Sequence, residues 1–478
     1  MNTKLLKQKI LDLAIRGKLT QQLKSDGNTA DLLKKICDRT QEKTSLRAKR
    51  GNPSPQTIIP LDKSEVPFEV PANWEWVRLG DLSESIQYGY NAPAKDNGRI
   101  KMVRISDIHE NEVEWETVPF CDIDEADIKI YSLKKNDILF ARTGGTVGKS
   151  YIVNDLPEEA VYAGYLIRTR YSENISAQYM KFFMESALYW DQLKDGCIAT
   201  AQPNCNGKTL GKMQIPLPPF AEQQRIVEKI QEAFAEIDSI ENNKELLKTH
   251  IKQARQKILD LAIHGKLVPQ NKSDEPASVL LERITRDNPH YEKIEDEPFE
   301  IPENWAWCKL GDVLNIARGG SPRPIQDYLT DDENGLNWIK IGDAEKGGKY
   351  IETVKEKIKP SGLSHTRAVK AGDFLLTNSM SFGRPYILKV DGCIHDGWLV
   401  LGNVKKSMIP DFLYFMLSSD FIYQSFAFAA AGSTVKNLKS ETVQRTLFPL
   451  PPLTEQSRIV TKIEELFSAL DQMERNLV

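Results

Sequence analysis

The sequence lacks the features that mark membrane, secreted and metal-binding proteins. It has no run of roughly 18 or more apolar residues, and its start, MNTKLLKQKI, is amphipathic, so we expect neither a membrane span nor an export signal. Its six cysteines and six histidines form no CxxC pair and no metal-ligand spacing, which excludes a zinc ribbon and favours a reducing compartment. These absences predict a cytoplasmic protein with no membrane partner and no metal site.

A strongly basic charge is missing too. The 63 Lys and Arg residues against 67 Asp and Glu residues give a net charge of −4. A protein that coats nucleic acid through phosphate contacts normally has a strongly basic domain, so any nucleic-acid binding here must be local or shared with partners. With 478 residues, 40% of them hydrophobic, the chain is long enough for two or three domains with cores of their own.

Enzyme motifs are incomplete. The segment TGGTVGKS, residues 143–150, resembles a phosphate-binding loop, but it has Thr143 where that loop needs glycine. The residues SYIVNDLP at its end predict a strand and a turn instead of the helix whose N-terminus would hold phosphate. A methyltransferase would need an Asn/Asp-Pro-Pro-aromatic segment, and the nearest approach, NPHY at 288–291, lacks the second proline. We expect no catalysis by this chain alone; a nucleotide-driven enzyme is the alternative that a nucleotide-binding assay would test.

What the chain does have is an internal duplication. An opening motif, a closing motif and a helical motif each occur twice: PFEVPANWEWVRLGDL (67–82) and PFEIPENWAWCKLGDV (298–313), PLPPFAEQQRIVEKIQEAFAEID (216–238) and PLPPLTEQSRIVTKIEELFSALD (449–471), and KILDLAIRGKL (9–19) and KILDLAIHGKL (257–267). In mid-chain the closing motif leads into the helical motif, whereas their other copies lie at opposite termini. The duplication is therefore circularly permuted, and the two termini should together rebuild the central helical segment about a pseudo-twofold axis.

The central segment repeats its seam positions at alternating spacings of four and three, which is the pattern of a coiled coil. The positions are Ile226, Ile230, Ala233, Ile237, Ile240, Lys244, Leu247, Ile251, Ala254, Ile258 and Leu261. The terminal copies continue the pattern at Ile459, Ile463, Leu466, Leu470, Met473, Leu477, Leu6, Ile10 and Leu13. Two matched stretches of this kind should pair antiparallel, and about 45 helical residues would make a rod of roughly 65–70 Å. A dimerisation coil is the plainer alternative.

Two bodies of similar length, 67–215 and 298–448, lie between the helical segments, and both look α/β. Predicted strands and a helix follow in the same order in each: 100–108, 136–143, 165–170 and 176–186, then 336–344, 372–379, 397–403 and 410–419. This alignment matches Asp137 with Asp373 and Gly148 with Gly383. Trp74, Trp76, Trp305 and Trp307 belong to the shared opening motif, so we expect them to pack in the core rather than to stack on a ligand.

The predicted organisation has seven parts. They are an N-terminal helical segment (1–45), a linker (46–66), a first recognition body (67–215), a central coiled-coil helix (216–268), a linker with a short helix (269–297), a second recognition body (298–448) and a C-terminal coiled-coil helix (449–478).

The paired motifs PxxWxWxxLGD, PLPPxxEQxRIV and KILDLAxxGKL resemble the specificity subunits of type I restriction–modification enzymes, over nearly the whole chain. The resemblance implies two α/β (α+β) target recognition domains in pseudo-twofold arrangement, separated by a long antiparallel helical coiled coil. Each domain would read one half of a split, asymmetric target in double-stranded DNA, while the helices set the spacing and dock two methylation subunits. The chain itself would bind no cofactor, because S-adenosylmethionine, ATP and Mg would belong to those subunits and to motor-nuclease restriction subunits.

The loops that differ between the two bodies are the expected DNA-contacting surfaces, because glycine turns let the backbone approach a groove and polar side chains suit phosphates and base edges. In the first body the candidates are Tyr88, Tyr90, Lys95, Arg142, Thr143, Thr146, Lys149, Gln202, Asn204, Asn206 and Lys208. In the second they are Arg318, Ser321, Arg323, Asn378, Ser379, Ser381, Arg384, Ser433, Thr434, Lys436, Asn437 and Lys439. Solvated hairpin tips are the alternative for each residue, and a coiled-coil adaptor that binds only protein is the alternative for the whole chain.

Overall fold

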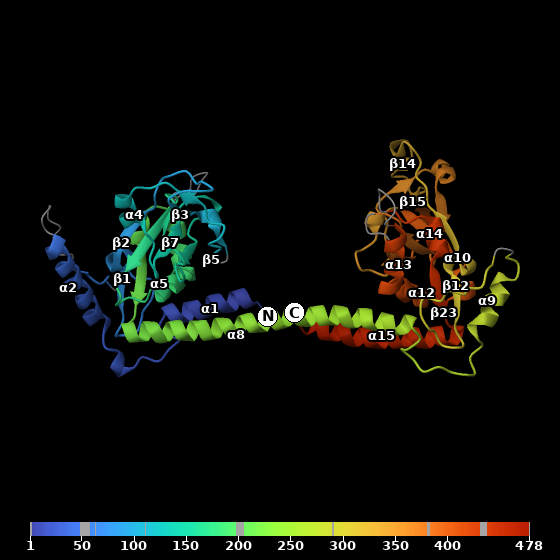
Figure 1. Ribbon diagram of the computed structural model, residues 1–478, viewed down its shortest axis with the longest axis horizontal. Helices are drawn as coiled ribbons and strands as arrows, with labels where there is room; N and C mark the ends of the chain where they lie inside the picture. The colour runs from blue at the N-terminus through green and yellow to red at the C-terminus, as the bar shows by residue number, and fades with distance from the viewer. Residues whose placement is uncertain are drawn as a thin grey trace. The chain divides into compact units, whose positions relative to one another are not determined.

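The computed structural model describes residues 2–47, 58–62, 64–109, 111–196, 205–288, 291–379, 383–430 and 437–477. The chain divides into two compact units, Met1–Asn243 and Lys244–Val478, each with its own α/β body (Figure 1). Within the described residues, no helix is long and apolar enough to cross a membrane. The same residues contain no group of three or more His, Cys, Asp or Glu side chains that could hold a metal ion.

Unit 1 contains a four-stranded and a three-stranded sheet that share one hydrophobic cluster. The larger sheet has the order β2-β10-β7-β8 with all neighbours antiparallel, and the smaller has the order β6-β3-β9 with β3 and β9 parallel. The strands span Ser83–Tyr88 (β2), Ile100–Val103 (β3), Ile108–His109 (β4), Glu112–Val113 (β5), Phe120–Cys121 (β6), Ile138–Ala141 (β7), Ser150–Ile152 (β8), Ala160–Tyr162 (β9) and Leu166–Tyr171 (β10).

Unit 2 repeats this plan with two five-stranded sheets. One has the order β13-β22-β19-β20-β16, in which β16 adds a parallel strand, and the other has the order β14-β17-β15-β21-β18. The strands span Asn315–Arg318 (β13), Leu329–Thr330 (β14), Leu336–Ile339 (β15), Tyr350–Ile351 (β16), Lys357–Ile358 (β17), Arg367–Val369 (β18), Phe374–Thr377 (β19), Pro385–Leu388 (β20), Gly392–Ile394 (β21) and Trp398–Gly402 (β22).

The strands and helices predicted for both bodies are confirmed, but four predicted strands are too long. The strands predicted at 136–143 and 372–379 are Ile138–Ala141 (β7) and Phe374–Thr377 (β19). Those predicted at 100–108 and 336–344 end after four residues, as β3 and β15. An aspartate folds the backbone back in each case: Asp107 accepts a hydrogen bond from the Arg104 amide at 2.8 Å, and Asp343 accepts one from the Lys340 amide at 2.8 Å. A side chain that bonds its own backbone in this way competes with the strand ladder.

Each body starts and finishes in a two-stranded antiparallel ladder. The opening strand β1 (Glu75–Arg78) pairs with the closing strand β11 (Gln214–Leu217), and β12 (Ala306–Lys309) pairs with β23 (Leu447–Leu450). The opening-motif tryptophans lie against these ladders and are at most 5% exposed, so their predicted core role is confirmed: Trp74, Trp76, Trp305 and Trp307.

In each unit, the Glu-Gln pair of the closing motif connects the helix on which it lies to the α/β body. In unit 1, Gln223 Oε1 accepts from the Ser176 amide at 2.8 Å, and Glu222 accepts from Trp74 Nε1 at 2.9 Å. In unit 2, Gln456 Oε1 accepts from the Ile409 amide at 2.9 Å. Both glutamines are fully buried, which explains why an amide, with one acceptor and one donor end, occupies this position in each copy.

The arginine of the closing motif reaches the segment that follows the helical motif. Arg225 makes a two-pronged ion pair with Asp26 at 2.6 and 2.7 Å, and Arg458 makes the equivalent pair with Asp274 at 3.4 and 2.7 Å. The residues after each helical motif therefore pack beside the closing motif of the same unit, although Asp26 and Arg225 are far apart in sequence.

The helices complete both units. They span Thr3–Ile15 (α1), Thr29–Arg47 (α2), Leu79–Leu82 (α3), Glu125–Tyr131 (α4), Ala177–Phe183 (α5), Ala187–Gly196 (α6), Gly207–Gly211 (α7), Phe220–Ile263 (α8), Ala277–Thr285 (α9), Leu310–Val313 (α10), Val404–Ser407 (α11), Pro410–Leu417 (α12), Asp420–Ala430 (α13), Ser440–Arg445 (α14) and Leu453–Arg475 (α15). The 44-residue helix α8 is continuous across the boundary between the units.

Helix α8 has an antiparallel helical partner in each unit, as the permuted duplication predicts (Figure 1). In unit 1, Lys7 of α1 pairs with Asp238, while the earlier residue Thr3 bonds the later residue Glu241 at 2.7 Å. In unit 2, Arg255 pairs with Asp471 of α15, and its guanidinium lies 5.1 Å from the centre of the Phe467 ring.

The predicted coiled-coil seam is buried at some positions and exposed at others. Ile226, Ile230 and Ile237 of α8 are at most 4% exposed, whereas Ile240 is 49% and Leu247 is 40% exposed. On α1 the buried residues are Leu11, Ala14 and Ile15 instead of the predicted Leu6, Ile10 and Leu13. The reason is that α1 and α8 contribute to the same hydrophobic cluster as the α/β body, so their buried faces do not follow a single helix–helix seam.

The ion pair between Arg225 and Asp26 should contribute measurably to stability. The Asp26 side chain is 2% exposed and that of Arg225 is 30% exposed, so Asp26→Asn should lower the free energy of unfolding by about 2–3 kcal/mol in urea titrations at neutral pH. Hydrogen bonds from Arg225 lower the pKa of Asp26 in the folded state, so this contribution is present above about pH 4 and is lost as the pH falls through the folded pKa.

The matched control is Asp12→Asn, because Asp12 pairs with Arg16 at 2.8 Å but both side chains are well exposed. That substitution should cost less than about 0.5 kcal/mol. Equal costs for the two variants, or a difference between wild type and Asp26→Asn that persists well below pH 4, would contradict the assignment.

Candidate nucleic-acid interface

Equivalent backbone hydrogen bonds bring four distant segments together at one edge of each body. In unit 1 they run from Gly89 to Leu166 at 3.0 Å, from Arg142 to Tyr165 at 3.3 Å and from Cys205 to Arg142 at 3.0 Å. In unit 2 they run from Gly319 to Trp398 at 2.9 Å, from Asn378 to Gly397 at 3.0 Å and from Leu438 to Asn378 at 2.7 Å. Tyr88 therefore corresponds to Arg318, and Arg142 corresponds to Asn378.

Glycine is needed where these segments cross. A Cβ at Gly89 would lie 2.2 Å from the carbonyl oxygen of Ala163, and a Cβ at Gly319 would lie 2.3 Å from that of His395. Both distances are shorter than real contacts allow. Each body therefore needs glycine immediately after its first DNA-contacting candidate, which is Tyr88 in unit 1 and Arg318 in unit 2.

In unit 1 this edge forms the first cluster, defined as Tyr88, Arg142, Tyr165 and Gly207. The Arg142 guanidinium carbon lies 4.8 Å from the centre of the Tyr88 ring, and the Tyr88 hydroxyl accepts a hydrogen bond from the Gly207 amide at 3.0 Å. Tyr88 is 40% and Tyr165 is 64% exposed. The cluster thus presents a cation over the accessible Tyr88 ring, and a backbone hydrogen bond joins Arg142 to the exposed Tyr165.

The glycine-rich segment beside the first cluster is a turn and not a phosphate-binding loop. Gly144–Thr146 forms a single 3₁₀ turn, and the strand β8 follows where a nucleotide site would need a helix. Gly148 has φ +89°, and a Cβ there would meet the Leu193 side chain at 2.1 Å. The turn leaves Thr143 and Thr146 partly exposed and Lys149 exposed.

Three of the other candidates of unit 1 have partners within the protein. Lys95 forms an ion pair with Asp122, and the Tyr90 ring packs 5.3 Å from Tyr131, where burial raises the pKa of Tyr90. Asn206 accepts from the Thr209 amide at 2.9 Å and so caps α7. Lys208 is exposed in the first turn of that helix, and Gln202 and Asn204 lie outside the described residues.

In unit 2 the edge forms the second cluster, defined as Arg318, Ser321, Arg323, Asn378 and Asp396. The Asp396 carbonyl accepts from Arg318 Nε at 2.9 Å and from Asn378 Nδ2 at 2.8 Å. The Asp396 carboxylate accepts from Ser321 Oγ at 3.0 Å and lies 3.5 Å from the Arg323 guanidinium. Four of the predicted residues therefore converge on one aspartate that the sequence analysis did not select.

The remaining candidates of unit 2 lie at neighbouring positions. Arg384 occupies the place of Lys149, because the Thr377 amide donates to its carbonyl at 3.0 Å as the Ala141 amide donates to that of Lys149 at 2.9 Å. Ser379 and Arg384 are partly exposed, whereas Asn437 and Lys439 are exposed. Ser381, Ser433, Thr434 and Lys436 lie outside the described residues.

A family model described as the type I restriction modification DNA specificity domain matches residues 71–249 and again residues 302–478. The two matches cover well over half of the chain. The chain belongs to this family.

Curated relatives and solved structures agree with that assignment. The chain is 24% identical to the type I restriction enzyme EcoAI specificity subunit of Escherichia coli, over 98% of this chain and 90% of the relative. A chain from a structure of the type I R-M system aligns with a TM-score of 0.58 and 20% identity, over 86% of this chain and 94% of that one. The HsdS subunit from Thermoanaerobacter tengcongensis aligns with a TM-score of 0.52 and 20% identity, over 87% and 94%. These two likenesses show the fold.

Each α/β body is thus a recognition domain of this family, and the clusters contain two side chains that the sequence analysis missed. Tyr165 and Asp396 both lie in the turn that precedes β10 or β22. Only the pairing of that strand with its neighbours brings the turn beside Tyr88 and Arg142, or beside Arg318 and Asn378. A search for periodicity could not have found these two residues. The turn does differ in sequence between the two copies, and that difference could have marked it as a candidate loop.

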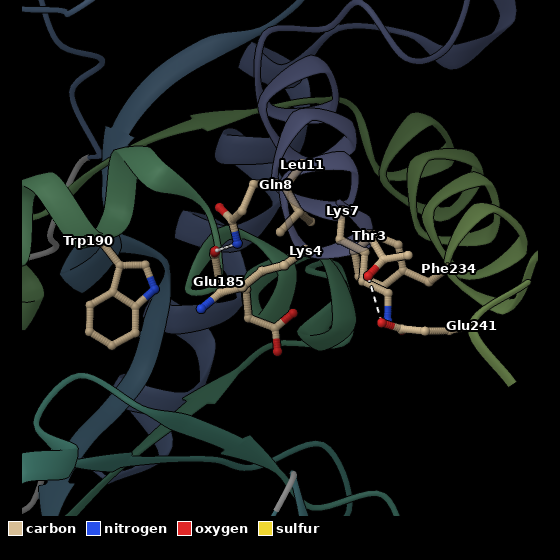
Figure 2. A pocket seen from close by; sticks show the side chains of 9 residues that line it. All are labelled: Thr3, Lys4, Lys7, Gln8, Leu11, Glu185, Trp190, Phe234 and Glu241. Atoms are coloured by element: carbon tan, nitrogen blue, oxygen red, sulfur yellow. Dashed lines mark hydrogen bonds between the residues drawn. The ribbon is translucent and has the colours of Figure 1, made fainter. Parts of the chain in front are cut away.

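A cavity of about 380 Å³ lies elsewhere in unit 1, among α1, α6 and α8. Figure 2 shows that Gln8 bonds the Glu185 carbonyl on its wall, at 3.1 Å, and that Thr3 bonds Glu241 at 2.7 Å. None of the predicted DNA-contacting residues lines this cavity. It is a feature of the helices and not of the first cluster.

Proposed function

We propose that this chain is the specificity subunit of a type I restriction–modification complex, and that its two recognition domains read the two halves of a split, asymmetric target in double-stranded DNA. The observation that carries the proposal is the edge described above. One backbone arrangement places Tyr88 and Arg142 in the first domain but the exposed Arg318 and the buried Asn378 in the second. The first edge offers an aromatic ring with a cation and the second offers a cation without that ring, so the two edges should prefer different bases.

The partners follow from the same proposal. Two methylation subunits would dock on the helices and carry S-adenosylmethionine, and motor-nuclease restriction subunits would carry ATP and Mg, all in the cytoplasm. This chain would bind no cofactor and would supply the sequence preference. The continuous helix α8 would set the number of base pairs between the two half-sites, since half-site spacing follows from protein geometry.

Two other functions compete with this one. A nucleotide-driven enzyme loses its main support, because β8 stands where its phosphate-binding helix should begin. A coiled-coil adaptor that binds only protein would not need two unlike polar edges on equivalent backbones. An adaptor of this kind predicts that the chain does not bind DNA at any salt concentration, even in the presence of methylation subunits.

The function is tested by mapping methyladenine in the host genome by single-molecule sequencing, with and without this gene. Loss of methylation at one split, asymmetric motif is the expected result. Replacing residues 67–215 by the corresponding body of a relative should then change one half of that motif and leave the other half intact. An unchanged methylation pattern, together with failure of methylation subunits to co-purify with the chain, would refute the proposal.

Lys149 and Arg384 should contact phosphate in their respective half-sites, because each is a cation at the equivalent position beside a cluster. Substitution of either by glutamine should weaken binding of the complex to DNA and lower the slope of log K against log salt by about 1, with the preferred sequence unchanged. Lys229→Gln is the control, since Lys229 lies on α8 in an ion pair with Glu232 at 2.9 Å. A slope equal to that of wild type in both cluster variants would place Lys149 and Arg384 outside the interface.

The exposed apolar residues of the helices mark the expected docking surface for methylation subunits. Ile240 and Met473, each two residues after an ion-paired aspartate, are 49% and 53% exposed in their units. Ile240→Glu or Met473→Glu should remove one methylation subunit from the complex, because an apolar interface would have to bury an unpaired charge. Light scattering after size-exclusion chromatography measures the mass.

Ser239→Glu adds the same charge at the neighbouring exposed position of α8, which faces another direction, and should leave the mass unchanged. Full retention of both methylation subunits by Ile240→Glu and by Met473→Glu would show that docking uses another surface.

A further inference from the structure

The second cluster contains an acidic side chain on the surface that we expect to meet DNA. Asp396 lies in the turn before β22, its side chain is 28% exposed, and Arg318, Ser321 and Arg323 contact it or its carbonyl. A carboxylate near phosphate is repelled, so its presence at such a surface needs a compensating role. Two roles compete: an anchor for the neighbouring loop, or a direct contact with a base.

The fold does not need an acidic residue at this position. The equivalent residue of the first domain is Gly164, in a turn closed by the same hydrogen bond: Leu166 donates to Ala163 at 2.9 Å, as Trp398 donates to His395 at 3.1 Å. A Cβ at Gly164 would meet nothing closer than 3.6 Å, so this glycine is not imposed by crowding. The turn therefore forms with or without the carboxylate.

One carboxylate oxygen of Asp396 is already engaged within the protein. Oδ1 accepts from Ser321 Oγ at 3.0 Å and lies 3.0 Å from His395 Nε2. His395 Nδ1 accepts from the Gly397 amide at 2.9 Å, which places the imidazole proton on Nε2. Burial lowers the pKa of His395 and so favours this neutral form.

The other oxygen, Oδ2, remains available. Within the described residues it accepts no hydrogen bond, and its nearest cation is Arg323, at 3.5 Å on a side chain that is 82% exposed. The fixed Oδ1 determines the direction in which Oδ2 points, while Arg323 can move away with little loss, since exposed ion pairs contribute little. Asp396 thus offers one oriented, unsatisfied acceptor.

We propose that Asp396 Oδ2 reads a cytosine in the half-site of the second recognition domain by accepting a hydrogen bond from its exocyclic N4 amino group in the major groove. The proposal rests on the function proposed above. Thymine presents the O4 acceptor at the same place and guanine presents O6 and N7, all of which repel a carboxylate. Adenine offers its N6 amino group beside the N7 acceptor, which suits an amide better than a carboxylate. Cytosine is therefore the base that a lone acceptor selects.

The test compares wild type, Asp396→Asn and Glu352→Gln in the complete complex with methylation subunits. Methyladenine mapping supplies the motif of each complex, and competition binding then measures affinity for duplexes in which each cytosine of one half-site is changed to thymine. An asparagine can rotate to donate to thymine O4, so Asp396→Asn should lose about tenfold in preference for cytosine over thymine at one position. Glu352 is exposed, and its substitution matches the charge change, so Glu352→Gln should keep the wild-type motif.

The outcomes separate the two proposals. A relaxed preference at one position of one half-site, with the other half-site unchanged, supports the role of Asp396. Equal weakening of binding to all duplexes, with an unaltered motif, would make Asp396 an anchor of the Arg318 loop and overturn it. Competition binding reports this preference even if Asp396→Asn lowers overall affinity or stability. A wild-type complex without any split motif would overturn the proposed function itself, and this inference with it.

Discussion

The antiparallel ladder between the opening and closing strands constrains everything else in each unit. β1 pairs with β11 and β12 pairs with β23 in the same register, so that Trp76 faces Pro216 and Trp307 faces Pro449. Both ends of a recognition domain are thereby fixed at one place on the helices. Sequence change between them can alter the loops at the reading edge without shifting the ladder. This separation lets one fold carry two unlike reading edges.

The ladder also explains the circular permutation. Each body needs a helical motif and the segment after it to pack beside its closing motif. These two parts come from different places in the sequence in the two units. In unit 1 they come from the N-terminus, where Asp26 meets Arg225; in unit 2 they come from the continuation of α8, where Asp274 meets Arg458. The same contact forms in both cases, because packing depends on which segments meet and not on the order in which they are connected.

Sequence alone predicted the elements whose residues are dictated locally or by the repeat. The tryptophans, the strands and the matching of Gly148 with Gly383 followed from motifs that occur twice. The coiled-coil seam was wrong at Ile240 and Leu247, in the middle of α8, because a heptad pattern does not reveal where along a helix its apolar positions are covered. Asp396 was missed for a related reason: its partners come from segments that only the folded sheet brings together.

The reading edges also differ in what supports them. Beneath Tyr88, the buried Arg168 donates to Gln87 Oε1 at 2.6 Å, and the Tyr162 hydroxyl bonds the Gln87 carbonyl at 3.3 Å. The aligned residues of the second domain are the apolar Ala317, Val400 and Ile394.

A charged network thus supports the first edge, whereas apolar packing supports the second. If Tyr88 and Arg142 alone were moved into the second domain, they would lie on apolar residues instead of the charged network that supports them in the first. A transplanted pair would also replace Arg318 and Asn378, the two side chains that donate to the Asp396 carbonyl. The unit that carries specificity is for this reason the whole recognition domain between its two ladder strands, with its buried side chains, and not the exposed loop residues alone.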